Sequence, residues 1–137
     1  MIYTEAIKKE LDTILKAFEG YIQDQNYFDI VYSKKIGYVW LIIDPPGAAG
    51  AELLNTPEKM LNALFNDIIN EVINAPENTT HIPDVLTLTK YEETESRRRI
   101  TAILETIEEG GTKYLKYLDA YIKKYKDRYR EDDASVE

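Results

Sequence analysis

The alternation of hydrophobic and polar positions divides the chain into long amphipathic segments and one short, strongly apolar run. That run covers residues 38–43, is rich in β-branched and aromatic residues, and is ended by Pro45 and Pro46. Such a run is typical of a buried strand rather than of a helix. Residues 28–33 before it alternate, and Gly37 suits the turn between the two segments. We therefore expect a β-hairpin whose second strand is covered on both faces.

Apolar residues at helical spacing predict four helices around this hairpin. The first covers about residues 4–24, with Thr4 as its N-cap, and the second opens at Thr56, a capping threonine that is followed by proline. The third runs from about residue 91 to the pair Gly110 and Gly111, and the fourth follows directly. Because the glycine turn is short, the last two helices should pack as antiparallel neighbours.

These elements predict an α+β fold in which four helices pack on a small antiparallel sheet. The sheet is the hairpin, with a third short strand at residues 85–89, so the order is α-β-β-α-(β)-α-α. A chain of 137 residues has the size of one domain, and residues 1–130 should form it, followed by a disordered acidic tail at 131–137. The residues expected to be largely buried are Phe18, Trp40, Leu41, Ile42, Leu64, Phe65 and Ile68.

Composition excludes several kinds of site. The chain has no cysteine, so it has neither disulfides nor thiolate metal ligands. Its one histidine, His81, lies between Pro76 and Pro83, which prevent a helical pair of ligands, and we expect a surface side chain. We therefore expect no catalytic residue, no metal and no cofactor. Without a leader segment or an apolar stretch of membrane-spanning length, the chain should be a soluble, cytoplasmic protein.

The segment 44–52 is the first candidate for binding. A carboxylate at the end of the central strand followed by small residues could form a ligand loop, since small residues let a ligand approach the backbone. Phosphate-binding loops need a glycine pattern with lysine and serine or threonine, and this segment has neither. A simple connector is the alternative. The residues of the ligand loop would be Asp44, Gly47, Gly50 and Glu52.

The basic last helix is the second candidate. The chain has a net charge of −8, but residues 113–130 hold seven Lys or Arg against two Asp or Glu. Three interpretations stay open: an amphipathic helix that closes the core, a protein interface built on tyrosines, and a nucleic-acid surface in which aromatics stack on bases. The acidic remainder of the chain counts against nucleic acid. The interface would comprise Tyr114, Tyr117, Tyr121, Tyr125 and Lys124, with Leu115, Leu118 and Ile122 facing inward.

The run Arg97-Arg98-Arg99 resembles a basic patch at first sight. Three consecutive residues of a helix spread over about 200°, so they cannot share one face. Glu93 and Glu95 precede Arg97 and Arg99 by four positions, the spacing of helical ion pairs. We expect solvated ion pairs, with a contact to phosphate or to an acidic partner as the alternative.

The sequence thus favours a non-enzymatic binding or regulatory protein that acts through protein–protein contacts, either with a partner or with itself as a homodimer. An acidic inhibitor or immunity-type protein of a bacterial or phage system is one concrete form. The alternatives are a small enzyme or ligand-binding domain that uses residues 44–52, and a nucleic-acid-binding protein that uses the last helix. None of these interpretations involves a membrane or a metal.

Overall fold

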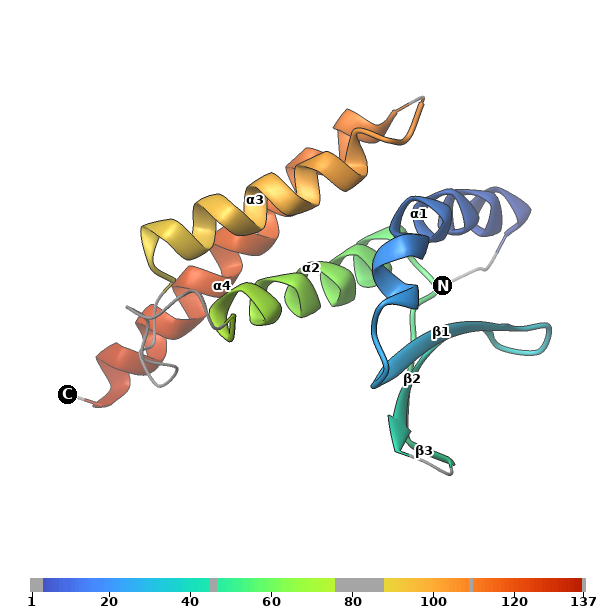
Figure 1. The fold of residues 1–137 in the computed structure, drawn as a ribbon, viewed down its shortest axis with the longest axis horizontal. Coiled ribbons are helices and arrows are strands. Elements are labelled where there is room, and N and C mark those ends of the chain that lie inside the picture. Colours follow the sequence, from blue (N-terminus) through green and yellow to red (C-terminus); the bar gives the residue numbers. More distant parts are fainter. Residues whose placement is uncertain (1–3, 45–46, 76–87, 109, 137) are drawn as a thin grey trace. The chain divides into compact units, whose positions relative to one another are not determined.

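The fold is α+β, with four helices and a three-stranded antiparallel sheet in the order α-β-β-β-α-α-α (Figure 1). In the computed structural model the chain is described over residues 4–44, 47–75, 88–108 and 110–136, and its side chains over the same residues except 44, 48–49 and 127–136. The predicted fold class is confirmed. The chain divides into two compact units, residues 1–61 and 62–137.

The first unit begins with the helix α1, Glu5–Gln23. As predicted, Thr4 is its N-cap, because the Thr4 Oγ1 accepts a hydrogen bond from the backbone N–H of Ile7 at 3.2 Å. The buried residues of α1 repeat at helical spacing and are Leu11, Ile14 and Phe18. The helix therefore buries one stripe and leaves its remaining surface to polar side chains.

The sheet follows as three consecutive strands, β1 Phe28–Ser33, β2 Gly37–Asp44 and β3 Gly47–Leu53, in the spatial order β1-β2-β3. Gly37 ends the predicted hairpin turn with a φ of 95°, a value that favours glycine. Asn55 holds this turn, since its Oδ1 accepts from the Tyr38 N–H at 2.9 Å and its Nδ2 donates to the Ile36 carbonyl at 2.8 Å. A Cβ at position 37 would lie 2.2 Å from that Oδ1, so only glycine fits.

The third strand corrects the sequence-based prediction. Residues 44–52 were expected to be a ligand loop or a connector. Residues 47–53 instead pair with β2, with Gly50 opposite Ile42 and Glu52 opposite Trp40. Glycine and alanine have low strand propensity and give no apolar alternation, so only the partner strand reveals this element. Of the predicted strand at 85–89, residues 85–87 lie outside the described residues, while Leu88 and Thr89 are not in a strand.

Burial agrees with the prediction in the helices and disagrees in the central strand. Four residues are buried as expected: Phe18, Leu64, Phe65 and Ile68. Trp40 and Leu41 are only half-buried, and Ile42 is 47% exposed, so the expectation that both faces of β2 are covered is wrong. The neighbour of Ile42 on β3 is Gly50, which has no side chain to cover it.

The helix α2, Pro57–Ile73, runs across the division between the two units. The Thr56 Oγ1 accepts from the Lys59 N–H at 3.1 Å, as the predicted cap requires. Nearly all of its apolar residues are buried: Met60, Leu61, Leu64, Phe65, Ile68, Ile69 and Val72. A helix that is apolar over so wide a stripe needs neighbours on more than one side.

Two further helices complete the second unit, α3 Lys90–Leu104 and α4 Leu115–Val136, joined through the short 3-10 helix η1 Gly111–Tyr114. They run antiparallel, as predicted, because Glu93 pairs with Lys126 while Arg97 pairs with Asp119. A capping box formed by Thr89 and Glu92 opens α3. The single domain at 1–130 with a tail at 131–137 stays a prediction, and the backbone of α4 continues to Val136.

Candidate interaction surface on the three-stranded sheet

Exposed apolar side chains gather on the sheet. Among the described residues, six large hydrophobic side chains are between 43% and 54% exposed, and five of them lie on the strands of the first unit or beside them. These five are Tyr27, Tyr32, Ile36, Ile42 and Leu53, and the sixth is Tyr91 of α3. Single exposed apolar residues are ordinary, but five on one small sheet mark a surface suited to contacts.

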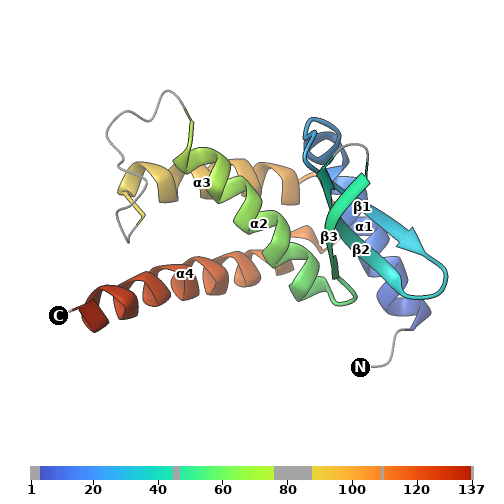
Figure 2. The ribbon, with the colours of Figure 1, turned by 90° about the horizontal axis from the view of Figure 1, so that it is seen from below.

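One face of the sheet is aromatic. Strand register places Phe28, Trp40 and Tyr38 on this face together with Tyr32 and Ile42. The Phe28 and Trp40 rings stack with their centroids 3.9 Å apart and an angle of 2° between their planes. The helix α1 lies beside the sheet (Figure 2). It contacts this aromatic face, since the Lys8 Nζ lies 4.8 Å from the centroid of the Tyr32 ring.

The opposite face is aliphatic. Val31, Val39 and Leu53 lie opposite one another on the three strands and form a row across the sheet. Leu41 and Ile43 extend this aliphatic face along β2, and both are half-buried. Antiparallel sheets usually present polar residues on a face that meets water. On this face Val39 is buried and Asp29 of β1 is an exposed charge, whereas Ala51 and Leu53 of β3 are exposed, so the part suited to a second contact lies along β3.

The two edges of the sheet differ. On β1 the Asp29 Oδ1 accepts a hydrogen bond from the backbone N–H of Ile30 at 2.8 Å, so a charged side chain occupies an outward amide of that edge. Along β3 no such bond is found among the residues that the structure describes. Gly47 is exposed at the beginning of β3, and the last three residues of the strand, Ala51, Glu52 and Leu53, are exposed as well.

The predicted ligand residues belong to this part of the sheet rather than to a loop. Asp44 pairs with Gly47 where β2 passes to β3, and Gly50 and Glu52 lie within β3. The side chain of Asp44 lies outside the described ones. Their backbones are thus fixed by the ladder with β2, and a ligand role for them stays a prediction without the loop on which it depended.

The tyrosines of η1 and α4 whose side chains are described mostly pack within the second unit itself. Tyr114 and Tyr125 are 2% and 6% exposed, and the Tyr121 hydroxyl donates to the Asn66 Oδ1 at 2.7 Å. The Tyr121 ring also meets that of Phe65 edge-on at 6.2 Å. Tyr117 and Tyr121 are both half-exposed. The proposed interface residues therefore separate into two buried tyrosines, two half-exposed tyrosines and an exposed Lys124.

Inward packing on α4 follows the prediction in part. Leu118 and Ile122 are buried as expected, whereas Leu115 is half-buried. The remaining exposed surface of this helix carries lysines, among them Lys116 and Lys123. The Lys116 Nζ lies 5.4 Å from the centroid of the Tyr117 ring. The sequence indicated correctly that this helix is basic, but it could not show which aromatic rings point inward.

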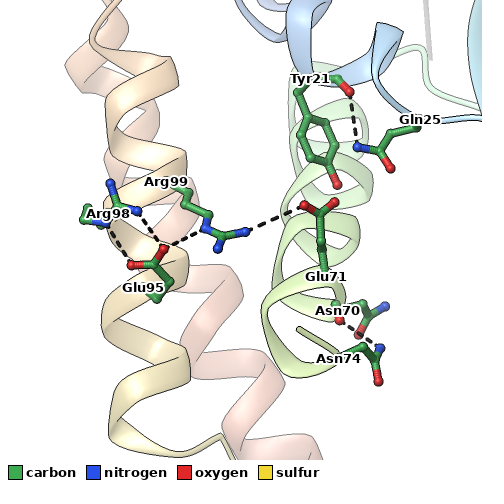
Figure 3. A network of polar contacts seen from close by, with 8 residues as sticks. All are labelled: Tyr21, Gln25, Asn70, Glu71, Asn74, Glu95, Arg98 and Arg99. Carbon is green, nitrogen blue, oxygen red and sulfur yellow. Dashed lines mark hydrogen bonds and ion pairs between the residues drawn. The ribbon is translucent and has the colours of Figure 1, made fainter. Parts of the chain in front are cut away.

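The three consecutive arginines all form ion pairs, and those of Arg97 and Arg99 have the predicted spacing of four. Figure 3 shows Arg98 and Arg99 against Glu95. Arg98 and Arg99 both bind the Glu95 carboxylate, at 2.6 Å and 2.8 Å. These two guanidinium groups lower the pKa of Glu95 to about 2 from an ordinary value of 4.5. Arg97 reaches Glu93 at 3.4 Å. The cluster is therefore neutralised locally rather than presented as a basic patch.

Contacts between helices extend this network in a way that the sequence could not reveal. The Arg99 Nη1 lies 3.7 Å from the Glu71 Oε1 on α2 (Figure 3), and the Lys126 Nζ lies 2.7 Å from the Glu93 Oε1. The hydrogen bond from Lys126 is the main reason that the pKa of Glu93 is lowered. The hydrogen bond to Asp119 likewise raises the pKa of Arg97. These ion pairs link the three helices of the second unit.

Other kinds of site find little support in the described residues. Within them no group of three or more histidine or acidic side chains could hold a metal ion, and His81 lies outside them. No described helix is long and apolar enough to cross a membrane. A hollow of about 370 Å³ lies along the first turns of α1, lined by Glu5, Ala6, Lys8, Lys9 and Asp12. Its Lys8 and Asp12 already pair with each other at 3.0 Å.

Comparisons of this chain with protein-family models, with curated proteins and with solved structures found no match. Its function is therefore argued from the surfaces described above. The sheet surface is the feature that sequence reasoning missed. Part of the signal for this surface was present in the sequence. Residues 38–43 are apolar at every position, and only one helix precedes them.

Proposed function

We propose that this chain is a non-enzymatic binding module that acts through protein–protein contacts made by its three-stranded sheet. The observation that carries the proposal is the exposure of large apolar side chains on both faces of that sheet, Ile42 on the aromatic face and Leu53 on the aliphatic face, at 47% and 46% exposure. Protein interfaces combine an apolar centre with a polar rim. The sheet offers both, because Glu52 and Asp29 are exposed charged residues beside the apolar ones.

The electrostatics support a cationic partner. The chain carries a net charge of −8, and an excess of negative charge accelerates encounters with basic surfaces. An acidic inhibitor of a basic protein, as in immunity-type systems of bacteria or phages, is one form that fits this charge. An enzymatic role would need convergent polar groups in a concave site, and the residues proposed for one are extended along β3.

Site-specific photo-crosslinking tests the proposal. A photoreactive residue replaces Ile42 or Leu53 in the purified chain, and the same residue at Lys123 on α4 serves as a matched exposed control. In an extract of the cells that carry the chain, we expect a discrete protein adduct from positions 42 and 53 but not from 123. The same adduct should be lost when the other sheet residue is changed to aspartate. Equal labelling from all three positions would refute a sheet-specific contact.

The lysines of α4 favour a second candidate, association with an acidic surface. Lys116, Lys123 and Lys124 are exposed on one helix of an otherwise acidic chain. The acidic residues of a second copy would suit them, and a two-fold dimer is the commonest form of self-association. Light scattering at low and high salt tests it, because such a contact weakens as salt screens the charges. A monomer at both salt concentrations would exclude self-association through α4.

A further inference from the structure

We propose that β3 receives an extended segment of the partner as a fourth strand, and that this segment alternates basic and apolar residues. This inference rests on the proposed function and adds the part of the sheet that is used and the chemistry of what binds there. The inference is carried by three observations: β3 is an edge strand of the described sheet, Glu52 on that strand is exposed, and Leu53 beside it is exposed as well.

The edge position of β3 determines the kind of segment. An edge strand presents backbone N–H and C=O groups that a further strand can pair, which is the basis of recognition by strand addition. The sheet order makes β1 and β3 the two edges, and the Asp29 side chain already occupies the Ile30 amide on β1. Strand addition is therefore favoured at β3.

The register locates the regular part of that edge. Residues 50–53 of β3 pair without interruption with residues 42–39 of β2, and the register shifts only beyond, between Ile42 and Ile43. A regular stretch keeps its hydrogen-bonding groups in the spacing that an added strand requires. Residues 50–53 thus form the docking edge.

The side chains of the docking edge define the partner's sequence pattern. Glu52 is the only charged residue of β3, and it lies on the aromatic face opposite Trp40. A residue of the added strand directly beside Glu52 shares that face, and a Lys or Arg there forms a favourable cross-strand pair. The positions on either side of it fall beside Ala51 and Leu53 on the aliphatic face, where apolar residues are favoured. The pattern that fits residues 51–53 is apolar–basic–apolar.

A second copy of β3 fits less well. It would place a second Glu52 and no cation on the paired strands. It would also bring together two chains that each carry a net charge of −8. A basic extended segment supplies the missing charge. Charge complementarity therefore selects a different protein over self-pairing.

Trp40 provides the readout, because it is the only tryptophan of the chain and the cross-strand neighbour of Glu52. The probe is a ten-residue synthetic peptide of alternating lysine and valine, titrated into the full chain while Trp40 emission is followed. We expect a saturable change in emission with wild type, weakened at least tenfold by Glu52→Lys. That variant should instead bind a peptide of alternating glutamate and valine. Glu105→Lys, an exposed residue on the second unit, changes the net charge equally and should leave wild-type binding intact.

Four results would overturn the inference. Equal weakening by Glu105→Lys would indicate general charge attraction, and equal binding of a lysine–valine peptide with a central proline would exclude strand addition, since proline breaks the ladder. A change in Trp40 emission with protein concentration alone would identify a second copy as the occupant. If crosslinks form at positions 42 and 53 while no peptide binds, the strand-addition inference fails and the proposed function stands. If the peptide binds while no crosslink forms, the proposed function fails and the strand-addition inference stands.

Discussion

At the scale of single residues, Ser96 of α3 is the clearest departure from good packing. Its side chain is fully buried, and its Oγ has no hydrogen-bond partner among the residues that the structure describes. A buried hydroxyl without a partner loses its water and gains nothing in return. We expect Ser96→Ala to raise the free energy of unfolding by about 1 kcal/mol in a urea titration. Thr13→Ala, at an exposed position of α1, controls for helix propensity. An equal gain in the free energy of unfolding there would show that the buried hydroxyl of Ser96 is not the cause.

Glu95 gives the second residue-scale prediction, a dependence of stability on pH. Its pKa is about 2 in the folded chain against an ordinary 4.5, so its contribution is present above pH 4.5 and is lost as the pH falls toward 2. At pH 7 we expect Glu95→Gln to cost about 1 kcal/mol, the scale of an exposed ion-pair network. The difference between variant and wild type should disappear near pH 2 when unfolding is measured at both values. A difference that persists there would show that packing, not charge, is responsible.

At the scale of elements, the sequence predicted what side-chain periodicity encodes. The capped starts at Thr4 and Thr56, the turn at Gly37 and the antiparallel pairing of the last two helices all follow from local chemistry or spacing. β3 could not be predicted, because its glycines and alanines carry no strand signal and its partner strand alone defines it. The candidate surface was missed for the same reason, since an edge exists only once the strand does.

Two glycines give an element-scale prediction with opposite signs. A Cβ at Gly111 in the turn between α3 and α4 would lie 2.3 Å from the Leu104 carbonyl oxygen, so the turn must distort. We expect Gly111→Ala to lower the free energy of unfolding by roughly 1–3 kcal/mol. Gly20 lies on the exposed side of α1, and a Cβ there would have no atom within 4 Å. We expect Gly20→Ala to raise the free energy of unfolding by roughly 0.5–1 kcal/mol. Guanidinium titrations of both variants check the pair, and a loss at both positions would contradict the geometry of α1.

At the scale of the whole molecule, the helix α2 connects two compact units without a break. Its residues up to Leu61 belong to the first unit and those from Asn62 to the second, and the helix continues through this boundary from Pro57 to Ile73. The division was not visible in the sequence, because no linker composition marks it. A continuous, buried helix is an unusual boundary, since domains generally meet in exposed and polar segments.

This continuity predicts that the chain unfolds in one cooperative transition. Leu61 and Leu64 are both fully buried and belong to different units, yet they lie in one uninterrupted helix, so we expect the loss of this helix to affect both units. Trp40 fluorescence reports on the first unit alone, whereas far-UV circular dichroism is dominated by the helices, of which α3 and α4 lie wholly in the second. The two signals should give the same midpoint in urea, and Phe65→Ala, which removes a fully buried ring from the second unit, should shift both by the same amount. Two separated midpoints, or a shift confined to the circular dichroism signal, would show that residues 1–61 fold independently and that the chain contains two domains.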